Sequence, residues 1–170
     1  MIHGSPDAAR EPAHEAVHGL TARSGAYAAL SAGFASAVGG ALVALRAAGK
    51  PLPARIAVGD VVLGGVATEK LSRLLAKDKI ASFVRAPFTE YQGPGGPGEV
   101  EEKPRGSGVR YAVGELLTCP YCLGLWVAAG YGLGLVGAPR ATRLTGFVLT
   151  ALTISDSLQI AYKAAEEKRL

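Results

Sequence analysis

Two cysteines stand three residues apart in a long uncharged segment near the middle of the chain. They are Cys119 and Cys122, the only cysteines present, with Pro120 and Tyr121 between them. The C-x-x-C spacing brings two thiols within one helical turn, close enough to form a disulfide or to share a metal ion. The same four residue types occur in glutaredoxin active sites, which follow a strand of a soluble fold. Here no charge occurs from residue 116 to residue 139, a length that can cross a bilayer as a helix.

Two carboxylates could complete a site around this pair. Glu115 falls on the same helical stripe as both cysteines, and antiparallel packing of the last apolar segment would bring Asp156 to the same end of the molecule. Three interpretations remain open. The pair is a redox couple in which Cys119 attacks and Cys122 resolves, or a metal site completed by Glu115, Asp156 or a second subunit, or small apolar packing residues.

A second motif lies in the polar N-terminal segment. His14, Glu15 and His18 fit H-E-x-x-H, which on a helix places two imidazoles on one face for zinc and supplies a general base. A metalloprotease helix packs inside a catalytic domain with a third ligand downstream, and we expect no such domain around this motif, so we interpret it as a chance match. Residues 1–24 are expected to form a flexible tail with at most one short helix. We expect no cleavable signal peptide there, because the first apolar run lacks an early basic region.

The composition is that of a membrane protein. The chain has 170 residues, 49% of them hydrophobic, and a mean hydropathy of +0.24, and the apolar residues are gathered into runs. The net charge is +4, with an isoelectric point of about 9.2. The basic residues flank the apolar runs, which favours a lipid bilayer rather than nucleic acid as the partner.

The apolar runs predict an all-α integral membrane four-helix bundle. The expected transmembrane domain covers residues 25–165, with spans at about 25–46, 55–75, 111–138 and 144–162. The intervening loop, residues 76–110, is expected to be partly disordered, because residues 93–98 are rich in glycine and proline. Asp60 lies near the start of the second span, where it either faces the bundle interior or reaches water at the interface.

The basic residues also predict an orientation. Of the 18 Lys and Arg residues, five lie in the two short turns and thirteen lie in the tail, the central loop and the C-terminal part. By the positive-inside rule we expect both termini and the central loop to be cytoplasmic, in a multi-pass membrane protein. Small residues in the first span, such as Gly33, Ala37 and Ala41, permit close helix packing and a homo-oligomer.

Four groups of residues resemble a family of small bacterial membrane proteins known as domain of unknown function family 1360. The groups are residues 70–78 (KLSRLLAKD), residues 85–89 (RAPFT), residues 114–122 (GELLTCPYC), and Ser155, Asp156, Gln159 and Tyr162. The resemblance covers roughly residues 55–162. It implies the fold and a location in the bacterial inner membrane, and it supplies no reaction and no cofactor.

These observations favour a membrane-anchored interaction or scaffold protein, with a candidate protein partner at the cytoplasmic loop. The alternative is a membrane thiol–disulfide oxidoreductase that uses Cys119 and Cys122, with Glu115 and Asp156 as further candidate catalytic residues.

Overall fold

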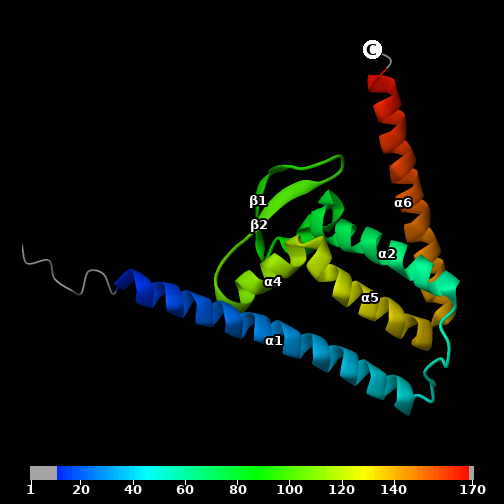
Figure 1. Cartoon of the computed structure of the whole chain (residues 1–170), viewed down its shortest axis with the longest axis horizontal. Helices are drawn as coiled ribbons and strands as arrows, with labels where there is room; N and C mark the ends of the chain where they lie inside the picture. The colour runs from blue at the N-terminus through cyan, green and yellow to red at the C-terminus, as the bar shows by residue number, and fades with distance from the viewer. Residues whose placement is uncertain (1–10, 169–170) are drawn as a thin grey trace, which may run out of the picture.

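The computed structural model describes the backbone of residues 11–168 and the side chains of residues 24–168. The elements in chain order are α1 (Glu11–Ala47), α2 (Val58–Lys77), the 3-10 helix η1 (Lys79–Ala81), α3 (Ser82–Arg85), β1 (Thr89–Pro94), β2 (Val100–Pro104), α4 (Gly108–Thr118), α5 (Pro120–Gly137) and α6 (Pro139–Glu167) (Figure 1). The mostly helical prediction is confirmed. The structure is not clearly the expected four-helix bundle, because the described part holds six α-helices and a two-stranded sheet.

Three of these helices are long and apolar enough to cross a membrane. They are the part of α1 from Ser24 to Ala47, α5 and α6. Helix α2, which covers most of the predicted second span, does not join them, because five charged residues interrupt its 20 residues. The prediction of several apolar membrane helices is therefore supported at this coarser level.

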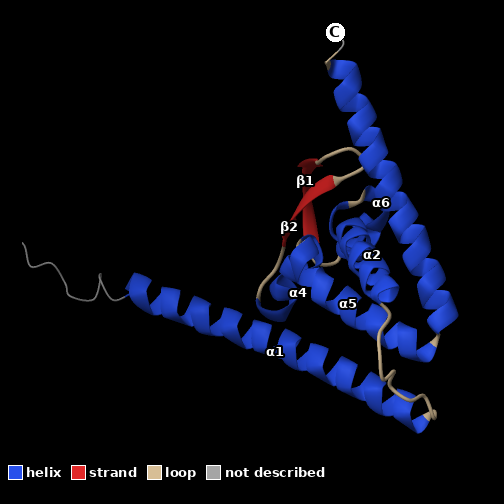
Figure 2. Cartoon of the chain, turned by 45° about the vertical axis from the view of Figure 1, so that its right-hand side comes forward, coloured by secondary structure: helices blue, strands red, loops and turns tan. Residues whose placement is uncertain are grey.

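Helix α2 is the element around which the other helices are arranged. It contacts both α5 and α6, while α1 lies along α4 and α5 (Figures 1 and 2). Its buried residues are small, and Gly64 allows the ring of Tyr131 from α5 to pack directly on its backbone. A Cβ atom at Gly64 would lie 2.9 Å from that ring, and one at Gly146 of α6 would lie 2.5 Å from the Tyr131 hydroxyl. Tyr131 of α5 therefore packs against α2 and α6 at positions where each of those helices has a glycine, Gly64 and Gly146.

The segment predicted as a partly disordered loop is folded, which corrects that expectation. After η1 and α3, β1 and β2 form an antiparallel hairpin in which Thr89 pairs with Pro104 and Tyr91 with Glu102 (Figure 2). The Gly- and Pro-rich passage is the turn of this hairpin. Gly98 at its end has φ +81°, a backbone conformation that favours glycine, and its carbonyl oxygen accepts a 3.0 Å hydrogen bond from the N–H of Lys79.

The predicted third span is two helices. Helix α4 ends at Thr118, Cys119 is extended with φ −109° and ψ 104°, and α5 begins at Pro120. Proline disfavours the helical conformation of the residue before it and is well suited to the first position of a helix. Pro120 therefore breaks the helix at Cys119.

The N-terminal motif lies partly outside the described residues. Helix α1 begins at Glu11, so the backbone of residues 14–18 is helical within the segment expected to be a tail. The side chains of His14, Glu15 and His18 lie outside the part of the chain whose side chains are described. Residues 1–10 also fall outside the described range.

Candidate functional site

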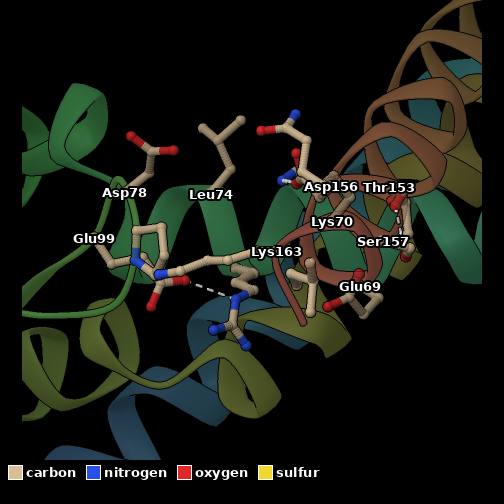
Figure 3. A pocket seen from close by; sticks show the side chains of 13 residues that line it. Glu69, Lys70, Leu74, Asp78, Glu99, Thr153, Asp156, Ser157 and Lys163 are labelled. Atoms are coloured by element: carbon tan, nitrogen blue, oxygen red, sulfur yellow. Dashed lines mark hydrogen bonds and ion pairs between the residues drawn. The ribbon is translucent and has the colours of Figure 1, made fainter. Parts of the chain in front are cut away.

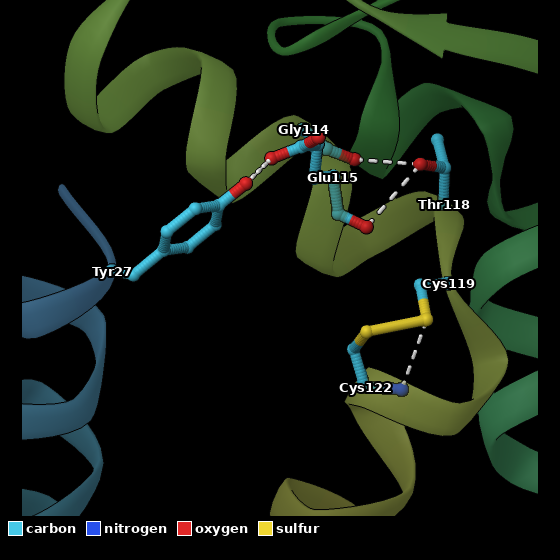
Figure 4. The surroundings of a disulfide bond; sticks show 6 residues. All are labelled: Tyr27, Gly114, Glu115, Thr118, Cys119 and Cys122. Carbon is cyan, nitrogen blue, oxygen red and sulfur yellow. Dashed lines mark hydrogen bonds between the residues drawn. A yellow bond between two sulfur atoms is a disulfide. The ribbon is translucent and has the colours of Figure 1, made fainter. Parts of the chain in front are cut away.

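The two cysteines are joined by a disulfide at the start of α5 (Figure 4). Their Cα atoms are 5.2 Å apart, and the backbone N–H of Cys122 donates a 3.1 Å hydrogen bond to the Sγ atom of Cys119. Cys119 is the residue that caps the helix, Cys122 is exposed, and the intervening Tyr121 is 94% exposed. In the reduced pair, a helix N-terminus and an aimed N–H favour the thiolate of Cys119.

Glu115 has a different partner from the one expected. Its carboxylate accepts a hydrogen bond from the hydroxyl of Tyr27, which joins α4 to α1 (Figure 4). Thr118 donates to the carbonyl oxygens of Gly114 and Glu115, at 2.9 and 3.3 Å. Among the residues with described side chains, no group of three His, Cys, Asp or Glu could hold a metal ion.

Asp156 is not brought to the cysteines. It forms an ion pair with Lys70 of α2. Ser72, two residues further along α2, faces α5, since its Oγ lies 3.9 Å from the position of a Cβ at Gly124. Two residues rotate a helix by about 200°. Helix α2 therefore separates Asp156 from the start of α5.

Asp156 instead lies in a charged groove between α2, α6 and the hairpin turn (Figure 3). The groove has a volume of about 620 Å³. Its charged lining residues are the acids Glu69, Asp78, Glu99 and Asp156 and the bases Lys70, Arg73 and Lys163. Gln159 and Ser157 add neutral hydrogen-bonding groups. Residues from two of the four groups that carry the family resemblance, residues 70–78 and the group with Asp156 and Gln159, therefore line one surface feature.

A buried ion pair fixes the hairpin that forms one wall of this groove. Arg85 is fully buried, and its guanidinium donates to both carboxylate oxygens of Glu102, at 2.8 and 3.2 Å. The remaining donors reach the carbonyl oxygens of Leu75, at 2.7 Å, and Asp78, at 3.1 Å. The Thr89 hydroxyl donates to Glu102 at 2.9 Å. This network joins the end of α2, α3 and both strands.

Two further ion pairs connect the hairpin to α2. Arg73 reaches Glu99 at 2.7 Å, and Lys77 reaches Glu101 at 2.9 Å. The bases are four residues apart on one helical face, and the acids are two residues apart in extended chain, with Glu99 directly before β2 and Glu101 within it, so the two spacings match. Sequence reasoning missed these contacts and the Arg85–Glu102 pair. Complementary spacing of Arg73 and Lys77 with Glu99 and Glu101 was the available signal.

Two curated relatives, both from Bacillus subtilis (strain 168), are similar to this chain. One is described as sporulation protein YjcA, 38% identical over 79 residues, which cover 40% of this chain and 60% of that protein. The other is described as UPF0713 protein YngL, 34% identical over 97 residues, which cover 56% of this chain and 72% of that protein. The chain thus spans less than two thirds of the length of YjcA.

No solved structure matches the chain. The family described as "Protein of unknown function (DUF1360)" matches residues 63–162, which run from α2 through the hairpin and the disulfide to the last turns of α6. These residues include both cysteines and most of the charged groove. The chain therefore belongs to the DUF1360 family.

Proposed function

We propose that this protein is a membrane-anchored interaction protein whose charged groove binds a protein partner on the cytoplasmic side. In this proposal α1, α5 and α6 cross the bilayer. Helix α6 has 29 residues and is about 43 Å long, whereas the hydrocarbon core is about 30 Å thick. Its last turns, which carry Gln159 and Lys163, can therefore project past the lipid beside the hairpin.

The observation that carries the proposal is the set of ion pairs that joins the walls of the groove. Three ion pairs hold the hairpin to α2 and α3, and the Lys70–Asp156 pair joins α2 to α6 on the other side. These ion pairs give the groove a defined shape before any partner arrives. Lys163 lies in the groove without an ion-pair partner among the described residues. A fixed pattern of both charge signs favours selection among partners.

Site-specific photocrosslinking in cells tests this function. A photoreactive amino acid replaces Gln159 in the groove, and a matched one replaces Glu90, which is exposed on the hairpin outside the groove. We expect one discrete protein adduct at position 159, lost when Lys163→Glu is added, and none at position 90. The proposal is contradicted if position 159 gives no adduct, or if Lys163→Glu leaves that adduct unchanged.

The disulfide favours a second candidate function, a thiol–disulfide oxidoreductase. In this role the Cys119–Cys122 disulfide takes two electrons and two protons from a dithiol substrate, which becomes a disulfide. In the reverse direction Cys119 attacks as a thiolate and Cys122 releases the mixed disulfide. The N–H directed at the Sγ atom of Cys119 supports Cys119 as the attacking thiolate.

Thiol trapping before and after mild reductant, combined with elemental analysis of the same membrane-purified sample, tests the second candidate. A reversible disulfide in the physiological range of potentials supports it, and Cys119→Ser and Cys122→Ser would then each abolish activity in a folded protein. Bound zinc or iron would point to a metal site. Two free, unreactive thiols without metal contradict both chemistries and leave the cysteines as packing residues.

A further inference from the structure

A second groove lies at the opposite end of α2 from the hairpin, where α1 and α5 end. It has a volume of about 430 Å³, within the range of small-molecule sites. Its walls are apolar side chains of α1 and α5, including Val38, Leu42, Leu133 and Val136. Leu52 and Ile56, from the linker between α1 and α2, also line it and are 47% and 62% exposed. Both walls come from helices that are apolar enough to cross a membrane.

The charges at this end of the molecule are almost all positive. Residues 46–55, which begin in the last turn of α1, and residues 140–143 at the start of α6 lie at this end. They hold five basic residues, Arg46, Lys50, Arg55, Arg140 and Arg143, and the only acid beside them in the sequence is Asp60. These groups sum to +4, which equals the net charge of the whole chain. The rest of the chain is therefore neutral overall.

The groove itself contains one uncompensated guanidinium. Arg143 donates to both carboxylate oxygens of Asp60 at 2.8 Å, so this pair neutralises itself at the groove rim. Asp60 was expected either to face the bundle interior or to reach water at the interface. The structure directs its carboxylate at α6, where Arg143 is its partner. Arg55 lines the same groove, is exposed, and has no ion-pair partner among the described residues.

We propose that this groove binds one anionic phospholipid, with an acyl chain against the α1 and α5 walls and the phosphate on Arg55. The inference rests on the membrane location in the proposed function. A guanidinium presents a planar fork of donors that matches phosphate oxygens. An apolar groove with a guanidinium at its rim suits an acidic phospholipid, because the groove shields the acyl chain from water while the guanidinium binds the phosphate. Nothing in the relatives' descriptions assigns such a site.

Lipid retention by the full-length protein tests the site. Protein purified in detergent is exchanged into mixed micelles that contain either phosphatidylglycerol or phosphatidylcholine, and bound lipid is measured by native mass spectrometry. We expect the wild type to retain one phosphatidylglycerol in preference to phosphatidylcholine. Arg55→Gln should weaken phosphatidylglycerol binding by about tenfold or more, as expected for loss of a charge-assisted contact.

Two further variants separate the site from general surface charge. Arg140→Gln removes the same charge at the same end, and Arg140 does not line the groove, so retention should be unchanged. Ala129→Phe fills the groove and keeps Arg55, so retention should fall. Thermal unfolding in detergent checks that each variant is folded.

Several outcomes overturn the lipid site. Equal losses in Arg55→Gln and Arg140→Gln would mean diffuse attraction to the basic end. Equal retention of the two lipids would remove the role of the headgroup. A dimer that Ala129→Phe disrupts would make the occupant a second copy of the chain. If an alkaline wash releases the wild type from membranes, the membrane proposal itself fails, whereas retention in membranes without selective lipid binding contradicts only this site.

Discussion

The Arg85–Glu102 pair allows a quantitative test of how the hairpin is held. Arg85 is 0% exposed and the Glu102 side chain 6% exposed, so both charges are removed from water. Glu102→Leu leaves the guanidinium buried without its counter-charge. Removal of one partner of a buried ion pair costs about 3–5 kcal/mol. Because the pair joins α3 to β2, this cost should appear as loss of hairpin structure.

Amide hydrogen exchange in β1 and β2 measures this loss. If exchange follows the open population, about 3–5 kcal/mol corresponds to exchange faster by about two to three and a half orders of magnitude. The matched control is Glu90→Leu, which removes an exposed partner of Lys103 at 3.4 Å on the same hairpin. Exposed pairs contribute about 0–1 kcal/mol, so exchange should change by less than about tenfold.

The double variant Arg85→Met with Glu102→Leu isolates the unpaired charge. It should exchange more slowly than Glu102→Leu alone, because no buried charge remains. Recovery is expected to be incomplete, because the carbonyl oxygens of Leu75 and Asp78 lose their donor. The stabilising role of the pair is contradicted if amide exchange in Glu102→Leu is no faster than in the Glu90→Leu control. It is also contradicted if the double variant exchanges as fast as Glu102→Leu alone.

Two predictions concern glycines at close contacts, both measured by thermal unfolding in detergent. Gly114→Ala should destabilise by about 1–3 kcal/mol, because its Cβ would lie 2.6 Å from the carbonyl oxygen of Phe88. The control is Gly130→Ala, whose Cβ has no atom within 4 Å, so it should be neutral or stabilising by up to about 1 kcal/mol. If Gly114→Ala and Gly130→Ala lose the same stability, the close packing at Gly114 is contradicted. Tyr131→Phe should partly restore the stability lost in Gly146→Ala, because it removes the hydroxyl that the new Cβ would meet. We expect a coupling free energy of about 0.5–3 kcal/mol between the two substitutions. If their effects on stability are strictly additive, the close contact between Tyr131 and Gly146 is contradicted.

The apolar helices were predictable because length and lack of charge are local properties of the sequence. The uncharged runs located the membrane-competent parts of α1, α5 and α6. The break before α5 was also readable, since Pro120 disfavours a helical Cys119. A continuous span places Glu115, Cys119 and Cys122 on one stripe, whereas the break makes Cys119 a cap.

The hairpin was not predictable from composition. Its glycines and prolines are typical of a linker, and its strands carry charged residues on both faces. Its order depends on partners far along the chain, chiefly Arg85 with Glu102 and Arg73 with Glu99. The same limit applies to Asp156, whose carboxylate is directed to Lys70 of α2 rather than to the cysteines. A pairing across 86 residues leaves no periodic signal in either helix.

In the proposed orientation the hairpin and its groove face the cytoplasm, and the basic end faces the other side of the membrane. A variant with Cys119→Ala and Cys122→Ala, carrying one new cysteine as either Glu90→Cys on the hairpin or Lys50→Cys in the first turn, is treated with a membrane-impermeant thiol reagent. We expect the reagent to label Lys50→Cys in intact spheroplasts and to label Glu90→Cys only after permeabilisation. Labelling of Glu90→Cys in intact spheroplasts would contradict this orientation.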